Sequence, residues 1–429
     1  MIKKNTLLIK LGNVFFLGYN RLMFDQMLYQ LKRPYHFFKT GLLRGLTSQI
    51  KYKFPEKKLK IICITGTDGK TTTSTLTYHL LKTAGKKVGL ISTVAAYIGD
   101  EQIDTGLHVT APGPMKLRAF MQKMVTANCE YLVLEMTSHG AYQFRDWGIK
   151  PLIAGVTNIT HEHLDYHLNY ENYVEAKALI LQKAQTVFLN QDDQSFYRLK
   201  QKMDLKKQQV RSYSLEHELD KKLEKAIQEK FPEKYNQANA HLAVSIAEDI
   251  DIEIKKLVKG ISSFKGVPGR MEEIKNNKKL KIIIDFAHTP NALYQALTSL
   301  RQQLKQQKNS GKLIAVYGCA GLRDQSKRPM MGKIGVQLAD LVVFTAEDPR
   351  TEDVWSIIRQ MKEQLETGHN KIVSIADREQ AIEFALTKLA KPGDTIGILG
   401  KGPEKSMCYG TIEIPWSDKE AVKKILKKI

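Results

Sequence analysis

Cysteine and long apolar runs are both scarce in this chain of 429 residues. Its four cysteines, Cys63, Cys129, Cys319 and Cys408, lie far apart and form no C-x-x-C pair. That spacing excludes a zinc ribbon and a disulfide framework, and it indicates a reducing compartment. No apolar run approaches the roughly 18–20 residues of a membrane-spanning helix, and no small-x-small cleavage site follows the start of the chain. We therefore expect a cytoplasmic protein.

Acidic residues are scarce in the first part of the chain. Residues 1–60 hold 13 Lys/Arg against two acids, which accounts for about half of the net charge of +21. Within this stretch an apolar stripe recurs at every fourth position: Phe38, Leu42, Leu46 and Ile50. The spacing predicts an amphipathic helix that either packs on the next domain or lies on an anionic membrane. A nucleic-acid partner is not expected, because aromatic platforms and a recognised binding fold are missing.

Three zones follow from the sequence patterns. Residues 1–55 predict a basic amphipathic helical segment, 56–268 a doubly wound α/β domain with a parallel sheet, and 269–429 a second α/β domain. Apolar runs predict buried parallel strands at 86–93, 130–136, 152–159, 281–288, 312–318, 341–348 and 394–400. The charged stretch 199–234 is interpreted as a solvated helix or a connector.

A short glycine-containing motif, "GTDGKT" (66–71), follows the apolar run "KIICI" (60–64) and precedes a helical pattern. Its glycines let backbone N–H groups turn toward a phosphate, and the helix N-terminus adds partial positive charge. Lys70 would reach the outer phosphates and Thr71 would place a hydroxyl on Mg²⁺. The general motif has a glycine where Ile64 stands, so a simple tight turn before a helix is the alternative.

Other polar residues accompany this motif. Glu135 ends a predicted buried strand, where open α/β sheets bind ligands. A second strand end carries "NITHEHLDYH" (158–167), with three histidines around Asp165, and Lys177 lies in a helix that is otherwise apolar and acidic. A lone histidine is usually structural, but this cluster favours a metal-bound nucleotide site.

Nine motifs stand in the order and spacing of one family: "GTDGKTTT", "EMTSHG", "NITHEHLDYH", "YVEAKALI", "VPGRMEEI", "DFAHTPNAL", "GCAGLRDQSKRPMMG", "EDPR" and "GKGPE". The chain resembles the Mur ligases over roughly residues 56–429, and within them the MurE type, which adds the third amino acid of the peptidoglycan stem peptide. The resemblance implies a P-loop central domain followed by a Rossmann-like C-terminal domain.

The resemblance also implies an ATP-dependent amide-bond ligase that joins diaminopimelate or lysine to UDP-N-acetylmuramoyl-L-alanyl-D-glutamate. Because joining a carboxylate to an amine in water is uphill, transfer of the γ-phosphoryl group would first give an acyl phosphate. The implied cofactors are ATP, two Mg²⁺ ions and a carbamylated Lys177. A monomer is expected.

Site residues follow from the same resemblance. The implied ATP-binding residues are Gly66, Thr67, Asp68, Gly69, Lys70, Thr71, Thr72, Asn239, Arg270, Asp285 and His288. The implied metal ligands are Thr71, Glu135, His163 and Lys177, and the implied catalytic residues are Lys70, Glu135, His163 and Lys177. The implied substrate-binding residues are Thr110, Thr137 and Arg145 for the muramoyl peptide, and Asp348, Arg350, Gly400 and Glu404 for the amino acid.

Three features depart from the family pattern. About 55 residues precede the central domain and show no α/β pattern, so either the basic helical segment or a different, membrane-bound carrier is expected at the uridine end. Asp348 replaces the usual asparagine before Arg350, and Pro403 replaces the usual histidine. An acid at position 348 would favour the ammonium of lysine, whereas Arg350 matches diaminopimelate, so the choice of amino acid stays open.

Two alternative functions remain. One is another Mur-type ligase, similar to folylpolyglutamate synthase or to a lipid-linked muropeptide ligase. The other is a non-catalytic, nucleotide-binding protein of the membrane surface, which would have no need to retain the set Lys70, Glu135, His163 and Lys177.

Overall fold

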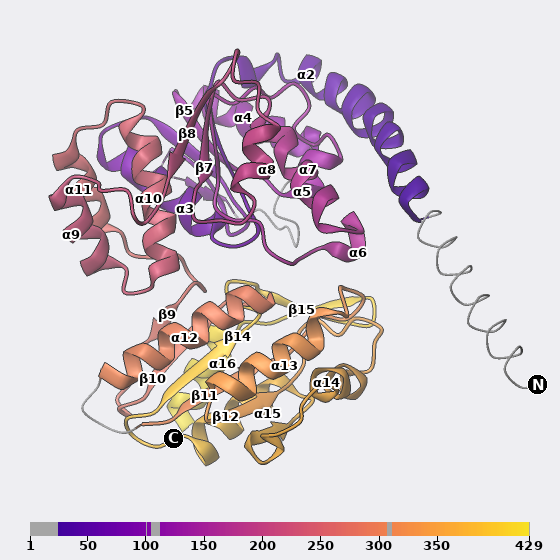
Figure 1. The fold of residues 1–429 in the computed structure, drawn as a ribbon, viewed down its shortest axis with the longest axis vertical. Helices are drawn as coiled ribbons and strands as arrows, with labels where there is room; N and C mark the ends of the chain where they lie inside the picture. Colours follow the sequence, from indigo (N-terminus) through magenta and orange to yellow (C-terminus); the bar gives the residue numbers. More distant parts are fainter. Residues whose placement is uncertain (1–24, 100, 104–111, 307–310, 429) are drawn as a thin grey trace, which may run out of the picture.

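Two α/β domains and a helix along the side of the first form the chain (Figure 1). The computed structural model describes residues 25–99, 101–103, 112–306 and 311–428. The first 24 residues of the predicted helical segment therefore lie outside the described part.

The central domain is built on an eight-stranded sheet. Its strands, in spatial order, are β4 (Glu101–Ile103), β3 (Ala96–Ile98), β2 (Val88–Ile91), β5 (Tyr131–Glu135), β1 (Lys60–Thr65), β6 (Ile153–Val156), β7 (Thr186–Asn190) and β8 (Gln209–Tyr213). All neighbours pair in parallel except β2–β3 and β3–β4. The carboxyl ends of β5, β1 and β6 therefore meet at one edge, where open α/β sheets bind ligands.

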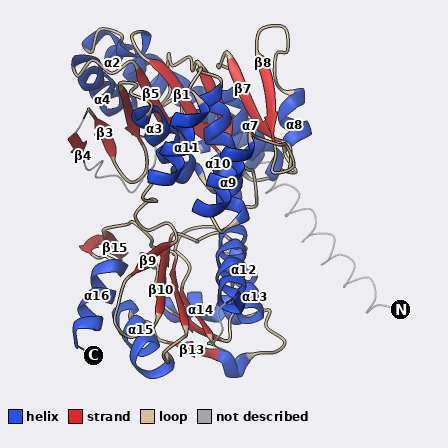
Figure 2. Cartoon of the chain, turned by 90° about the vertical axis from the view of Figure 1, so that its left-hand side faces the viewer, coloured by secondary structure: helices blue, strands red, loops and turns tan. Residues whose placement is uncertain are grey.

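Helices cover both faces of this sheet and bury two separate apolar cores (Figure 2). One face carries α4 (Pro114–Thr126), α5 (Ser138–Tyr142), α7 (Tyr170–Leu181) and α8 (Phe196–Gln201). The other carries α3 (Lys70–Thr83), α9 (Lys221–Lys230), α10 (Lys234–Glu248) and α11 (Ile254–Ser263). Because both faces are covered, the inner strands are continuous apolar runs.

The C-terminal domain repeats this arrangement. Its sheet has the order β13 (Ile372–Ser374), β12 (Leu341–Phe344), β11 (Leu313–Tyr317), β14 (Thr395–Leu399), β10 (Lys281–Asp285) and β9 (Glu272–Ile274), with β9 alone antiparallel within the described sheet. On one face lie α12 (Pro290–Gln306), α13 (Lys327–Leu338) and α14 (Val354–Lys362). On the other lie α15 (Arg378–Phe384), η4 (Ala385–Leu389) and α16 (Asp418–Lys428), and a hairpin of β15 (Ser406–Tyr409) and β16 (Ile412–Pro415) completes the domain.

The predicted fold class is confirmed, including both mostly parallel sheets and the helical N-terminal segment. The interpretation of 199–234 as a solvated helix or connector is wrong in part, because the stretch contains the edge strand β8 besides α9. β8 pairs with β7 alone and its side chains are largely exposed, so its sequence lacks the apolar run that predicts inner strands.

The N-terminal helix, residues 25–51, ends in the π-helical η1 (Phe37–Gly45) and α2 (Leu46–Lys51) and packs on the central domain. It does so through small residues, since a Cβ on Gly45 would lie 2.5 Å from the Trp147 ring and Gly41 faces the same ring. The alternative in which this helix packs on the next domain is confirmed, but the packing face is not the stripe: Phe38, Leu42, Leu46 and Ile50 are 59%, 37%, 41% and 63% exposed. Within the described residues, no helix has both the length and the hydropathy needed to cross a bilayer.

Candidate active site

The loop between β1 and α3 has the backbone shape of a phosphate-binding turn. Gly66 and Gly69 have φ of 147° and 78°, in the region that favours glycine. A side chain at Gly69 would also collide with the Asn239 amide, which packs on the loop from α10. Lys70 begins α3 and donates from Nζ to the Thr67 carbonyl at 2.6 Å. The helix N-terminus and one lysine therefore face the same turn.

A carboxylate stands beside this turn at the end of β5. Oε1 of Glu135 accepts hydrogen bonds from Thr71 Oγ1 at 3.1 Å and Thr93 Oγ1 at 2.9 Å. Arg270, from the start of the C-terminal domain, donates to Thr71 Oγ1 at 3.3 Å. Thr72, the next residue of α3, is buried. The Thr71 hydroxyl therefore lies between a carboxylate and a guanidinium.

Lys177 is buried on α7, directly beneath the loop. Its Nζ donates to the Gly66 carbonyl at 2.5 Å and lies 4.5 Å from the centre of the Tyr173 ring. The Tyr173 hydroxyl is 3.1 Å from Thr67 Oγ1, which ties this pair to the loop. Burial, followed by the neighbouring Lys70, lowers the pKa of Lys177 well below its usual value. Burial therefore disfavours the charged ammonium form of Lys177.

The histidine cluster of residues 158–167 does not converge on one point. His161 Nε2 lies 3.2 Å from Ser326 Oγ, across the domain boundary. His163, which has a left-handed backbone with φ of 57°, faces His139 with ring centres 4.6 Å apart. Desolvation, followed by the neighbouring His139, lowers the pKa of His163 well below its usual value. A neutral imidazole is thus available beside Lys177.

His167 has a structural environment instead. Its Nδ1 lies 3.0 Å from the Tyr29 hydroxyl of the N-terminal helix, and its Nε2 lies 3.0 Å from Ser138 Oγ on α5. Both ring nitrogens have partners, and burial lowers the pKa of His167 to about 2. His167 therefore links the N-terminal helix to the central domain as a neutral side chain.

Asp68 of the loop contacts the C-terminal domain. Its carboxylate accepts from Asn291 Nδ2 at 2.9 Å and from Thr289 Oγ1 at 3.2 Å, both at the start of α12. Its backbone N–H donates to Asn158 Oδ1 at 3.0 Å. The loop is thus held between β6 and the second domain.

The predicted C-terminal wall gathers around one aromatic ring. The Arg270 guanidinium lies 4.5 Å from the centre of Phe286, and His288 Nδ1 lies 2.8 Å from the Phe286 carbonyl. The Asp285 carboxylate accepts from the Met271 N–H at 2.7 Å. Burial raises the pKa of Asp285 to about 6, although Arg270 opposes that shift.

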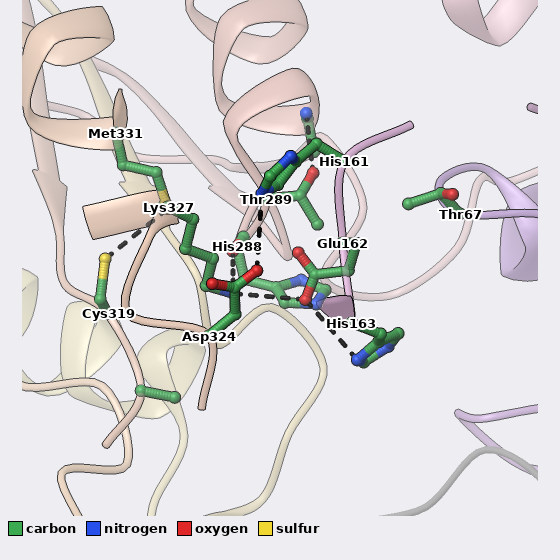
Figure 3. A network of polar contacts seen from close by, with 12 residues as sticks. Thr67, His161, Glu162, His163, His288, Thr289, Cys319, Asp324, Lys327 and Met331 are labelled. Atoms are coloured by element: carbon green, nitrogen blue, oxygen red, sulfur yellow. Dashed lines mark hydrogen bonds and ion pairs between the residues drawn. The ribbon is translucent and has the colours of Figure 1, made fainter. Parts of the chain in front are cut away.

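An ion pair that the sequence did not predict joins the two domains (Figure 3). Lys327 Nζ lies 3.4 Å from Glu162 Oε1 and donates to the His288 carbonyl at 2.8 Å, with both charged side chains buried. Burial raises the pKa of Glu162 to about 6. The sequence signal that could have singled out Lys327 is its position inside "GCAGLRDQSKRPMMG", one of the motifs shared with the family.

The residues predicted for the amino acid lie on the C-terminal domain. The Asp348 carboxylate accepts from Lys401 Nζ at 2.7 Å and from the Cys408 N–H at 3.0 Å. Lys401, which is 1% exposed, also pairs with Glu404. The single ammonium of Lys401 is therefore shared between the carboxylates of Asp348 and Glu404.

Arg350 lies on the same side of this domain and donates from Nη1 to the Gly321 carbonyl at 2.6 Å. Gly400 has φ of 106° and donates its N–H to the Asp285 carbonyl at 3.0 Å. A Cβ there would lie 3.0 Å from Oε2 of the buried Glu347. Gly400 is thus tied directly to the end of β10.

The residues predicted for the muramoyl peptide are partly visible. Thr137 caps α5 by accepting the Gly140 N–H at 3.0 Å. Arg145 donates to Gln143 Oε1 from Nη2 at 2.8 Å. Thr110 lies outside the described residues.

A cavity of about 380 Å³ separates Arg145 from the N-terminal helix. The helix contributes Lys39, Arg44 and His36 to its lining, and residues 112–114 form another wall. No acidic side chain lines this cavity among the described residues. It is therefore suited to an anionic ligand.

The matches to known families cover most of the chain. The Mur ligase middle domain matches residues 64–258, and the domain described as "Mur ligase, glutamate ligase domain" matches residues 269–402. A Clostridium acetobutylicum protein, UDP-N-acetylmuramoyl-L-alanyl-D-glutamate–2,6-diaminopimelate ligase 1, is 36% identical over 396 residues, covering 88% of this chain and 80% of that protein.

Solved structures agree with these matches. A UDP-N-acetylmuramoyl-L-alanyl-D-glutamate–2,6-diaminopimelate ligase has 28% identity and a TM-score of 0.56, covering 90% of this chain and 83% of the other. A bifunctional folylpolyglutamate synthase/dihydrofolate synthase from Yersinia pestis shares the fold at 18% identity, with a TM-score of 0.65, covering 84% of this chain and 91% of the other. The chain therefore belongs to the Mur ligase family, as an ATP-dependent, amide-bond-forming ligase of the MurE type.

Proposed function

We propose that the enzyme joins diaminopimelate to UDP-N-acetylmuramoyl-L-alanyl-D-glutamate. One observation carries the proposal: the loop, Glu135 and the amine of Lys177 meet at one edge of the central sheet, and the C-terminal domain contacts the same loop. The 36% identical relative from Clostridium acetobutylicum bears the name of that reaction.

The reaction requires an activated carboxylate. A carboxylate of the acceptor attacks the γ-phosphorus of ATP, so that an acyl phosphate forms and ADP leaves. The deprotonated amine of the amino acid then attacks the acyl carbon, forming the amide and releasing phosphate. Lys70 and the loop N–H groups would bind the transferred phosphate, and Arg270 would approach it from the C-terminal domain.

Magnesium fits the donors at this edge. The described residues contain no group of three or more His, Cys, Asp or Glu side chains arranged to hold a metal by themselves. Mg²⁺ does not need one, since it is usually bound by one or two carboxylates, phosphates and water. Glu135 with Thr71 would hold one ion, and His163 with Lys177 a second. When bound, such ions neutralise charge on the phosphates.

Lys177 would serve this second site as a carbamate. Its neutral amine would add to CO₂ and release a proton, which converts a base into a carboxylate-like anion. The lowered pKa supports this step, because a protonated ammonium has no lone pair for CO₂. The Yersinia pestis structure was determined with AMPPNP and a Mn ion, which agrees with a divalent cation on this fold.

Diaminopimelate is favoured over lysine by the charges around Asp348. A free acid at this position would attract the side-chain ammonium of lysine. Because the Asp348 carboxylate is already engaged by Lys401 and the Cys408 N–H, it is less available to an incoming ammonium, and the cation Arg350 would attract the second carboxylate of diaminopimelate. Arg145, Lys39 and Arg44 would receive anionic groups of the acceptor in the cavity beneath the N-terminal helix.

Phosphate release from ATP tests the proposal. Purified enzyme is supplied with UDP-N-acetylmuramoyl-L-alanyl-D-glutamate and with meso-diaminopimelate, lysine or ornithine separately. We expect release that depends on both substrates and is fastest with diaminopimelate. Equal or faster release with lysine would contradict the amino-acid assignment, and no release from folded, ATP-binding enzyme would contradict the acceptor.

A further inference from the structure

The outward face of the N-terminal helix is the most apolar exposed surface of the described chain. Ten of the 21 exposed large apolar side chains of the described residues fall between positions 27 and 50. Five of these are more than half exposed: Leu31, Tyr35, Phe38, Leu43 and Ile50. Such a concentration of exposed apolar side chains on one helix is typical of an interaction site.

This face is held in a fixed orientation by the opposite side of the helix. Gly41 and Gly45 lie against Trp147, and Tyr29 stacks on Tyr142 with ring centres 4.7 Å apart. Ser48 accepts a hydrogen bond from Arg118 at 3.2 Å. Because the packing uses these residues, most of the apolar side chains stay exposed to solvent, although Phe37 contacts Phe144 and Phe38 borders a cavity between the helix and the domain.

Positive charge predominates around the apolar face, and the only acid of the described helix is Asp25 at its first residue. Residues 26–55 contain six exposed cations and no Asp or Glu: Lys32, Arg33, Lys39, Arg44, Lys51 and Lys53. Residues 1–24 add four more Lys/Arg and no acid in sequence. Neither that segment nor a second copy of the same face complements this charge. Anionic lipid headgroups above an apolar layer complement both properties.

We propose that the N-terminal helix docks the enzyme on the surface of an anionic lipid bilayer. The apolar face enters the boundary between headgroups and acyl chains, and the flanking lysines and arginines contact lipid phosphates. The helix lies in the plane of the interface, as amphipathic basic helices do. A ligase held there would form its product next to the membrane.

Sedimentation of the full-length enzyme with vesicles tests this docking. The vesicles consist of phosphatidylcholine alone or of phosphatidylcholine with about 30% phosphatidylglycerol, a composition that supplies the anionic surface described for such helices. We expect binding to the anionic vesicles that weakens with added salt. The triple variant F38S/L43S/I50S should bind at least tenfold more weakly and keep its ligase activity in solution.

Two further variants keep the test specific. The control L205S/L322S/I412S removes three equally exposed apolar side chains from other places and should bind like the wild type. The variant K32Q/K51Q/K53Q should lose the preference for anionic vesicles. Circular dichroism and thermal unfolding establish that each variant is folded.

Three results would overturn the proposal. They are an absence of vesicle binding, equal weakening by the control variant, and wild-type self-association that F38S/L43S/I50S abolishes. The last outcome, measured by light scattering, would assign the face to a second copy of the chain.

Discussion

Replacing Lys177 with methionine separates the chemistry of this side chain from its packing. Methionine fills most of the same buried volume, and in enzyme free of CO₂ burial disfavours the charged ammonium that the substitution would remove. The remaining structural loss is the hydrogen bond to the Gly66 carbonyl, worth about 1 kcal/mol. We therefore expect the free energy of unfolding of K177M to fall by only about 1–2 kcal/mol.

The activity of K177M should fall far more. If the carbamate positions charge around the transferred phosphate, its loss should lower kcat by at least about 100-fold, or roughly 3 kcal/mol of transition-state stabilisation. Phosphate release measures kcat, and denaturant unfolding measures stability. A K177M enzyme within about threefold of the wild-type rate would refute the reasoning, since losing one preorganised charge costs more than that.

Rescue distinguishes a missing anion from a missing cation. In K177A, added formate or acetate should restore part of the rate because it replaces the carbamate oxygens. K70A is the matched control: its missing group is a cation, so carboxylate should restore nothing. Labelled ¹³C-bicarbonate should give a carbamate NMR signal in the wild type that K177M lacks.

Three other substitutions test the charges of the C-terminal domain. D418A should lower the free energy of unfolding by about 3–5 kcal/mol in denaturant titrations, because it leaves the fully buried Arg378 guanidinium without its carboxylate at 2.7 Å. K401M should raise the ratio of kcat/KM for lysine to that for diaminopimelate at least tenfold, since Asp348 then keeps an uncompensated charge. E347Q should flatten the dependence of unfolding free energy on pH. Burial raises the pKa of Glu347 to about 8, so its stabilising contribution is complete below about pH 4.5 and is lost as the pH rises through 8.

Each of these substitutions has a control. E420A removes an exposed ion pair with Lys423 and should change stability by less than about 0.5 kcal/mol. Adding D348N to K401M should abolish the gain for lysine, and an equal loss for both amino acids would contradict the charge argument. E366Q, at an exposed position, should leave the pH curve of unfolding unchanged.

Local chemistry explains what could be predicted from the sequence. The phosphate loop was recognisable because two glycines stand between an apolar run and a helical pattern. In the structure both glycines adopt the positive φ that such a turn requires. The same holds for the inner strands, whose burial on both faces requires continuous apolar residues. The ion pair of Lys327 with Glu162 could not be predicted in this way, since its partners are 165 residues apart and depend on how the domains meet.

The histidines of residues 158–167 show that closeness in sequence does not predict a shared site. Three of them lie within seven residues, which suggested a shared metal site, but His161 and His167 point to different partners. Residues in a turn and a one-turn helix do not share a face, so closeness in sequence is no measure of convergence. His167 stabilises the N-terminal helix through Tyr29, a partner 138 residues away.

The N-terminal helix shows that an apolar stripe does not identify the surface that covers it. Apolar periodicity indicates that one face of a helix is apolar, but it does not identify what packs against that face. Here close packing is achieved by Gly41 and Gly45 against Trp147, where any larger side chain would collide with the indole. A helix that already packs through glycine gains no stability within the fold from Leu43 or Ile50, which are 62% and 63% exposed. The apolar face is therefore available to a partner outside the fold, and its cations favour the anionic bilayer proposed above.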